Sequence, residues 1–347
     1  MTHTRRLMAV HAHPDDESSK GAATTARYAA EGHEVLVVSC TGGERGDILN
    51  PAFGTEPKTL DEMKQIRRTE MANAANALGV SQHWLGFVDS GLPEGDPLPP
   101  LPQGSFAAGN MRDEIAALVA VVRQFQPHVM TTYDPMGGYP HPDHVRAHQV
   151  ALGAFLAAGD PAAFPDAGPP WSVLKLYYNH DFSLARSMTL HEALREANHP
   201  SPFGEWIERR EQWDIVERPV TTRIDVADYQ SQRDTALLAH ASQIDPEGFF
   251  FAVPREIERD VWPWEEYELA ASRVPTHLPE TDLFAGIDPH AADTELQSRL
   301  TESAHVAGYE DLVPGDLLAD LIQGRTHAQS PWGIEGSSSP DDAEMEE

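Results

Sequence analysis

The chain of 347 residues carries 25 lysines and arginines against 55 aspartates and glutamates, so its formal net charge is −30 with neutral histidines. This negative surplus repels the phosphates of nucleic acids and anionic membrane surfaces. We therefore exclude both as partners that would bind through overall charge attraction. Apolar residues make up 40% of the chain and aromatic residues 8%, which is enough for a sizeable core.

The cysteine content and the N-terminal segment indicate the compartment. Cys40 is the single cysteine, so the chain forms no internal disulfide and needs no oxidising environment. The apolar run at residues 7–10 is too short for a signal peptide, and no segment reaches the roughly 20 apolar residues of a membrane span. We therefore expect a soluble, cytoplasmic protein in which Cys40, within a predicted strand, is a buried core residue rather than a nucleophile.

Short apolar runs alternate with longer segments of helical spacing in the first half of the chain. The predicted strands are residues 7–12, 34–41, 83–88, 128–133 and 173–178. The predicted helices are residues 19–31, 60–78, 111–125 and 144–157, with Gly32, Gly79 and Pro127 as stop signals. This rhythm predicts an α/β fold with a Rossmann-like, mostly parallel sheet and helices on both faces.

Three parts are expected along the chain. Residues 1–180 form the α/β core, residues 181–290 a smaller, irregular C-terminal subdomain, and residues 291–347 a peripheral segment with an acidic, disordered tail. The subdomain is predicted to contain helices at 229–240 and 264–271 and a strand at 220–226. Two long loops, 41–59 and 89–109, each follow a predicted strand and are expected to build a pocket, although plain surface insertions remain the alternative.

The first predicted strand ends in an unusual cluster, His11-Ala12-His13-Pro14-Asp15-Asp16-Glu17. Neighbouring carboxylates repel one another in a cleft unless a cation lies among them. Histidine and aspartate are both zinc ligands, and the spacing across a strand-to-helix turn lets His13 and Asp16 converge on one ion.

A second cluster, Gly137-Gly138-Tyr139-Pro140-His141-Pro142-Asp143-His144, follows the fourth predicted strand. Its glycines and prolines shape a turn that presents histidine and aspartate side chains at the start of the next helix. Both clusters thus fall at the carboxyl ends of parallel strands, where this architecture places its sites. Together they predict a metal site.

These two motifs resemble those of the zinc-dependent N-acetylglucosaminyl deacetylase family called LmbE-like or PIG-L-like. The resemblance covers residues 7 to 287, most of the chain. It is carried by the two clusters and by residues 9–21, Thr41-Gly42-Gly43-Glu44-Arg45-Gly46, Trp84-Leu85-Gly86-Phe87-Val88-Asp89-Ser90-Gly91 and Thr131-Thr132-Tyr133-Asp134. It implies amide hydrolysis with a bound Zn²⁺ ion, although a site of two histidines and one aspartate also suits Fe²⁺.

The resemblance also implies roles for individual residues. His13, Asp16 and His144 would hold the metal, and Asp15 would be the general base. His141 would stabilise the oxyanion as an imidazolium, with Asp143 orienting it and raising its pKa; a fourth metal ligand or a loop-stabilising residue is the alternative. Tyr139 would polarise the carbonyl.

Substrate contacts are implied for Lys20, Asp89 and either Arg67 or its neighbour Arg68. Arg67 and Asp89 match positions that grip sugar or inositol hydroxyls. Lys20 is typical of members that cleave mycothiol S-conjugates, so the implied partner is this small molecule; Lys20 would reach its acyl-cysteine portion. The stretch His240-Ala241-Ser242-Gln243 also resembles the family, and it is expected to support the site from behind.

Three other functions stay open. One is the deacetylase that acts on N-acetylglucosaminyl-inositol in mycothiol biosynthesis, and another is a tailoring amidase on thiol-conjugated natural products. The third is a zinc-binding scaffold without catalysis, which the presence of Asp15, Tyr139 and His141 disfavours. The sequence does not decide the oligomeric state.

Overall fold

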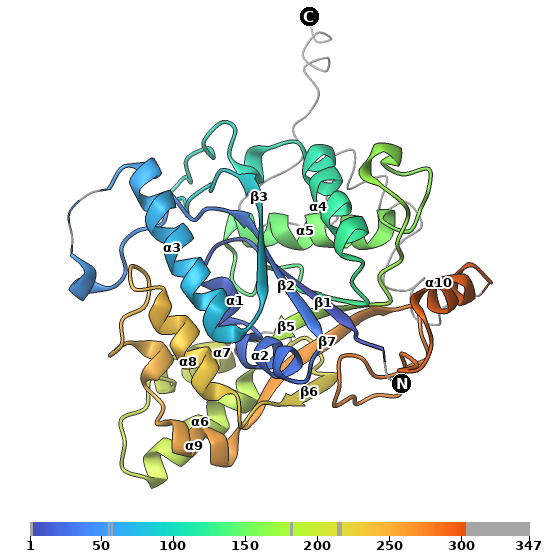
Figure 1. Cartoon of the computed structure of the whole chain (residues 1–347). Helices are drawn as coiled ribbons and strands as arrows, with labels where there is room; N and C mark the ends of the chain where they lie inside the picture. The colour runs from blue at the N-terminus through green and yellow to red at the C-terminus, as the bar shows by residue number, and fades with distance from the viewer. Residues whose placement is uncertain (1–2, 55, 57, 181–182, 214–216, 303–347) are drawn as a thin grey trace, which may run out of the picture.

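A computed structural model describes residues 3–54, 56, 58–180, 183–213 and 217–302. In this part of the chain a seven-stranded sheet has the order β3-β2-β1-β4-β5-β7-β6 (Figure 1). The strands are β1 (Arg6–His11), β2 (Glu34–Thr41), β3 (Ser81–Phe87), β4 (Val129–Thr132), β5 (Lys175–His180), β6 (Thr222–Asp225) and β7 (Trp264–Ser272). The first five are mutually parallel, while β7 is antiparallel to both β5 and β6. The predicted α/β class with a mostly parallel sheet is confirmed.

Helices cover both faces of the sheet. They are α1 (Asp16–Ser19), α2 (Ala22–Ala30), α3 (Leu60–Leu78), α4 (Met111–Phe125), α5 (Pro142–Ala157), α6 (Leu184–Glu196), α7 (Gly204–Trp213), α8 (Gln230–Ala239), α9 (Arg255–Val261) and α10 (Asp293–Glu302). In Figure 1, α4 and α5 lie on one side of the strands, and α2 and α3 lie on the other. None of the helices in the described ranges is long and apolar enough to cross a membrane.

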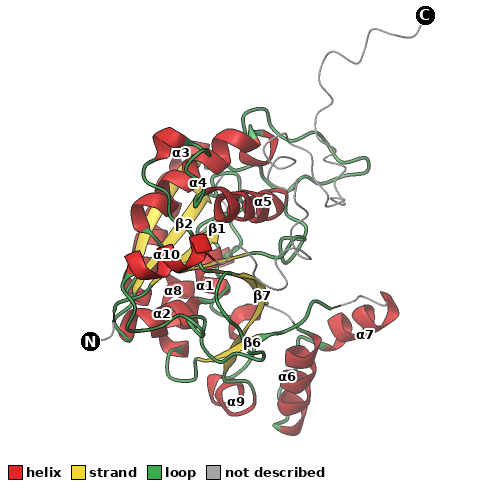
Figure 2. Ribbon diagram, turned by 90° about the vertical axis from the view of Figure 1, so that its right-hand side faces the viewer, coloured by secondary structure: helices red, strands yellow, loops and turns green. Residues whose placement is uncertain are grey.

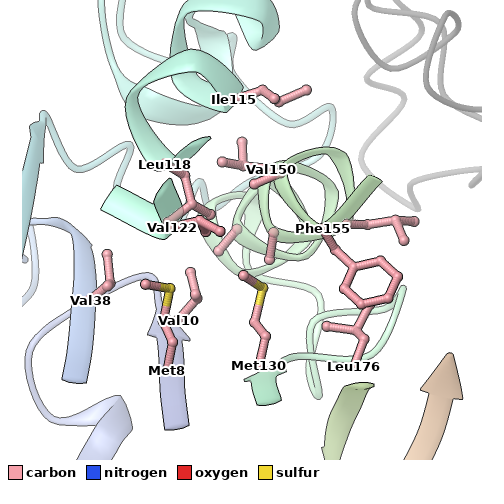
Figure 3. Packing of buried hydrophobic residues seen from close by; sticks show 14 of the residues in the cluster. Met8, Val10, Val38, Ile115, Leu118, Val122, Met130, Val150, Phe155 and Leu176 are labelled. Carbon is pink, nitrogen blue, oxygen red and sulfur yellow. The ribbon is translucent and has the colours of Figure 1, made fainter. Parts of the chain in front are cut away.

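The main core lies between the sheet and the α4–α5 layer (Figure 3). Side chains alternate between the two faces of a strand. Met8 and Val10 of β1 therefore pack toward Leu118 and Val150, whereas Ala9 packs toward Met71 of α3 on the opposite face. Cys40 is buried in the main core, as predicted.

Most predicted elements of the first half are present with small changes of boundary. The predicted helices at 60–78 and 111–125 match α3 and α4, and Thr59 forms a capping box with Glu62 at the start of α3. The predicted helix at 19–31 is interrupted, because Gly21 takes a φ of +72° between α1 and α2. A Cβ atom there would lie 2.8 Å from the Tyr267 hydroxyl.

The prediction of a helix at 264–271 is wrong, because this segment is strand β7. Its three glutamates and its i, i+3 apolar spacing favour a helix in isolation, but pairing with β5 and β6 overrides that local preference. Each glutamate finds a partner in the sheet setting: Glu265 accepts from two backbone N–H groups at the start of α2, Glu266 pairs with Arg223, and Glu268 pairs with Arg218.

The region expected to be a smaller, irregular subdomain that completes the fold contributes two strands to the same sheet. The predicted strand at 220–226 contains β6, and the predicted helix at 229–240 contains α8. Figure 2 shows α6, α7 and α9 gathered beside β6 and β7. Arg186, Arg233 and Arg255 converge there on the buried Glu258. The predicted acidic tail at 336–347 lies outside the described residues.

Candidate active site at the ends of β1 and β4

Both predicted clusters lie at the carboxyl ends of adjacent strands. β1 sits between β2 and β4. The chain runs from β1 through β2 to β3 on one side of β1 and then crosses to β4 on its other side, so the direction of the strand order reverses at this point. Such a switch point opens a crevice at the strand ends. The turn after β1 supplies His13, Asp15 and Asp16, and the loop from β4 into α5 supplies Tyr139 and His141.

Two pairs of side-chain atoms, both involving Asp16, lie at the separation that neighbouring ligands of a tetrahedral metal ion have. Oδ2 of Asp16 is 3.5 Å from Nδ1 of His13 and 3.4 Å from Nε2 of His144. Zinc–ligand bonds of about 2.1 Å in a tetrahedron place neighbouring ligand atoms about 3.4 Å apart. A nitrogen of His141 also groups with those of His13 and His144, within 4.8 Å of one another.

The environment of His144 fits a metal ligand, because a hydrogen bond to one ring nitrogen fixes the orientation of the other. Its Nδ1 donates to the Gly137 carbonyl at 2.9 Å, which leaves the lone pair on Nε2. That Nε2 is buried and has no hydrogen-bond partner among the described residues. Gly137 is needed for this approach, because with φ at +76° a Cβ atom there would lie 2.7 Å from Cβ of His144. The donor set therefore fits a metal ion.

His13 is oriented by two carboxylates on the far side of its ring. Its Nε2 lies 3.2 Å from Asp143 and 3.5 Å from Asp89, so Nδ1 faces Asp16. Burial lowers the pKa of His13, but Asp89, Asp143 and Asp16 outweigh burial and hold the pKa well above its usual value. Carboxylates behind a ligating histidine fix its tautomer and raise its basicity.

Asp16 receives hydrogen bonds on both oxygens. Oδ2 accepts from the Tyr133 hydroxyl at 2.6 Å and from the His13 backbone at 3.0 Å. Oδ1 accepts from the Lys20 ammonium at 2.9 Å. Lys20 also donates to Ser19 at 3.1 Å and is not among the residues that line the large cleft beside the metal-ligand group. Lys20 thus contacts Asp16 here, and its expected contact with substrate stays a prediction.

Asp15 has a strained backbone. Its φ is +101°, a region that non-glycine residues occupy at a cost of about 1–3 kcal/mol, and such strain concentrates at functional sites. Arg67 holds the turn by donating to the Pro14 carbonyl and, at 3.1 Å, to Oδ2 of Asp15. Burial raises the pKa of the Asp15 carboxyl, and Arg67 opposes that change. In this backbone conformation Asp15 lines the cleft.

A second clamp on Asp15 comes from the distant C-terminal region. Glu17 accepts the Asp15 backbone N–H at 2.8 Å, and its other oxygen accepts from Nε2 of His240 at 2.6 Å. Ser242 donates through its backbone and its hydroxyl to Glu70 of α3. The His240–Gln243 stretch thus supports the turn after β1 from behind.

His141 and Asp143 do not form the expected ion pair. The backbone N–H of Asp143 donates to Nδ1 of His141 at 3.1 Å, which places the proton of the neutral ring on Nε2. The Asp143 carboxylate instead accepts from His13 and from the Ser90 backbone. Burial, together with the neighbouring His13 and His144, lowers the pKa of His141 to about 2. The contact with the Asp143 backbone places a lone pair on Nδ1, and the role expected of His141 stays a prediction.

Asp89 and Arg67 both line the cleft. Asp89 accepts from the backbone N–H groups of Arg45 and Gly91 at 2.9 and 2.8 Å. Arg67 is 2% exposed, whereas Arg68 is exposed and lies over the Trp84 ring. Arg67 is therefore the arginine of this pair that faces the site.

The cleft has a volume of about 590 Å³, within the range typical of small-molecule sites. Tyr139, which is 48% exposed, lies on its edge with its ring 4.7 Å from that of His144. The loops predicted to build a pocket supply much of its wall, including Arg45, Leu49 and Leu92.

Two supporting residues escaped the sequence reasoning. Tyr133 closes a predicted strand, yet no sequence signal shows that its hydroxyl contacts Asp16. Glu17 stands within the motif, but its partner His240 is 223 residues away, a separation that local patterns do not bridge.

Comparison with known proteins agrees with this geometry. Residues 8–155 match the family described as PIG-L: GlcNAc-PI de-N-acetylase. The mycothiol S-conjugate amidase of Streptomyces coelicolor is 54% identical over 84% of this chain and 100% of its own length. This chain belongs to the PIG-L family. An inositol deacetylase of Streptomyces avermitilis, the 1D-myo-inositol 2-acetamido-2-deoxy-alpha-D-glucopyranoside deacetylase, is 39% identical over 82% of this chain and 98% of its own.

A solved structure shows the same fold. The N,N'-diacetylchitobiose deacetylase of Pyrococcus horikoshii aligns with 89% of this chain and 89% of its own, at a TM-score of 0.52 and 17% identity. The family membership and the amidase relative together make this protein a hydrolase of amide bonds.

Proposed function

We propose that the protein cleaves the amide between glucosamine and N-acetylcysteine in mycothiol S-conjugates, releasing a mercapturic acid and glucosaminyl-inositol. The observation that carries this proposal is the 54% identity to a mycothiol S-conjugate amidase along that relative's full length. The inositol deacetylase relative, at 39%, supports the second candidate, deacetylation of N-acetylglucosaminyl-inositol.

In this proposal His13, Asp16 and His144 hold a zinc ion. The carboxylates behind His13, the carbonyl on His144 and the Tyr133 hydroxyl on Asp16 orient the ligand atoms. A catalytic zinc ion lowers the pKa of a bound water and polarises a carbonyl. Lys20 offsets the charge on the non-ligating oxygen of Asp16.

Asp15 is the proposed general base. It takes a proton from the attacking water as the oxygen bonds to the amide carbon, and it returns that proton to nitrogen as the carbon–nitrogen bond breaks. The clamps from Arg67 and Glu17 hold the carboxylate in place for both transfers. His141 donates from Nε2 to the oxygen that gains negative charge, and Tyr139, whose ring centroid lies 6.1 Å from that of His141, donates to the same oxygen.

The sugar end of the substrate is proposed to bind near Arg67 and Asp89. Both side chains are buried and are held by neighbouring backbone groups. Charged side chains that are fixed in this way form hydrogen bonds to hydroxyl groups at little further entropy cost.

A rate comparison tests the proposal. Purified, zinc-loaded protein should cleave a bimane conjugate of mycothiol at a higher kcat/KM than N-acetylglucosaminyl-inositol. The reverse order would support the biosynthetic deacetylase instead. Asp15→Asn should retain zinc and lose at least about 100-fold in kcat, the scale of general acid–base catalysis, whereas unchanged turnover would remove Asp15 as the base.

A further inference from the structure

The cleft has two chemically different parts. Its inner part is polar and contains Asp15, Arg67 and Asp89. Its outer part is lined by apolar side chains from the two long loops, including Leu49, Leu92, Pro93, Pro99 and Pro100. Leu49 is 64% exposed and Leu92 is 50% exposed, so these large side chains are uncovered next to the candidate catalytic residues.

Both loops are held in place although these side chains are uncovered. The Leu49 backbone N–H donates to the Ser242 carbonyl at 3.0 Å, and the Asn50 side chain donates to the Ala241 carbonyl at 2.8 Å. The apolar side chain of Leu49 is therefore presented by a backbone that is anchored on the C-terminal region.

The second loop is anchored at both of its ends. The Gly91 backbone donates to Asp89, and the Ala107 backbone donates to the Ser90 hydroxyl at 2.9 Å. Arg146 of α5 donates to the Ala107 carbonyl at 3.0 Å. Asp89 also accepts from the Arg45 backbone, so one carboxylate ties the two loops together. The bases of both loops are thus fixed relative to each other, which lowers the ordering cost of binding.

We infer that Leu49 and Leu92 form a subsite for the S-linked substituent of the conjugate, and that this substituent is neutral and apolar. The inference rests on the proposed function. In such a conjugate, the amide carbonyl has the polar glucosaminyl-inositol on one side and the substituted thioether on the other. The polar inner part and the apolar outer wall of the cleft match these two ends.

Charge at the cleft disfavours an anionic substituent. Asp47 and Glu94 line the cleft together with Arg45. Asp47 and Glu94 repel an anionic group, whereas an uncharged aromatic or alkyl group gains free energy by covering the exposed leucines.

The test compares the S-methyl and S-benzyl conjugates of mycothiol as substrates of the zinc-loaded, full-length protein. Leu49→Ser and Leu92→Ser should each lower the benzyl-to-methyl ratio of kcat/KM by about tenfold. Leu238→Ser is the matched control, because Leu238 is 45% exposed and does not line the cleft. An unchanged ratio in the cleft variants, or an equal fall in the control, would overturn the subsite.

A binding measurement separates this inference from the proposed function. Calorimetry with the same two conjugates is carried out on zinc-loaded Asp15→Asn protein, with and without Leu49→Ser. The subsite is supported if Leu49→Ser selectively weakens binding of the benzyl conjugate. It is overturned if the proteins with and without Leu49→Ser bind the benzyl conjugate with equal affinity. Failure of the wild-type protein to hydrolyse the methyl conjugate, with N-acetylglucosaminyl-inositol cleaved instead, refutes the proposed function whatever the binding data show.

Discussion

Replacing Glu17 by glutamine is expected to slow catalysis without removing the metal ion. Glu17 does not belong to the proposed ligand set, but it accepts the backbone N–H of Asp15 with one oxygen and Nε2 of His240 with the other. A glutamine side chain has the same shape, yet its amide group is a donor. Turned toward Asp15, that amide would face the backbone N–H donor now at 2.8 Å; turned toward His240, it would require the ring to move its proton from Nε2 to Nδ1.

The size of the effect follows from the strength of that contact. A hydrogen bond to a buried charged group contributes about 1.5–3 kcal/mol. The contact stabilises a backbone at φ +101°, whose intrinsic cost is of similar size, about 1–3 kcal/mol. If the loss appears as displacement of Asp15 from its working position, kcat falls by about 10- to 100-fold, since about 1.4 kcal/mol corresponds to a factor of ten.

The assay measures kcat, KM and zinc content for Glu17→Gln beside Glu70→Gln. Glu70 is also a buried carboxylate, and it contacts Ser242 rather than a residue of the Asp15 turn. We expect both variants to unfold at lower temperature, but only Glu17→Gln to lose kcat at full zinc occupancy. Equal losses of kcat in both, or retention of wild-type kcat in Glu17→Gln, would refute the positioning argument.

Three further predictions follow from the site and the core. Removal of the metal ion by a chelator should abolish hydrolysis and lower the unfolding temperature, and added zinc should restore both. His144→Ala should bind zinc at least about 100-fold more weakly, as measured by competition with a chromophoric chelator. Burial lowers the pKa of His128 to about 4, so between pH 6.5 and 4 the unfolded chain binds a proton at this residue and the folded chain does not. The free energy of unfolding should therefore fall by up to about 3 kcal/mol over this pH range. In a series of urea denaturations, His128→Gln should reduce that fall. Lys175→Met should cost about 3–5 kcal/mol because it leaves Glu280, its partner at 2.7 Å, charged and buried, whereas a double variant with Glu280→Gln should recover part of the loss in a thermal melt.

Local pattern accounts for the part of the fold that was predicted correctly. The strands and helices of the first half are long, periodic and bounded by stop signals, as in α3, where Thr59 begins the helix and Gly79 follows its end. The failure at β7 arises where local preference and tertiary pairing disagree. Its glutamates favour a helix, and only the neighbouring strands and their arginines make the extended form more stable.

The candidate site divides in the same way. The sequence by itself placed His13, Asp15, Asp16 and the second cluster at one edge of the sheet, because parallel strands end on a common side. Only the tertiary structure decided that Arg67 rather than Arg68 faces the cleft and that Lys20 turns to Asp16.

The pairing of Glu17 with His240 was also decided by the tertiary structure alone. Side-chain direction and long-range contacts depend on packing among segments that are distant in the chain, and no local spacing encodes them. The charge of −30 predicted repulsion of polyanionic partners from the start. The geometry of a few acids then carried the argument for chemistry: the half-buried Asp15 and the buried Asp16, Glu17 and Asp143 each have fixed partners, which makes them costly to misplace.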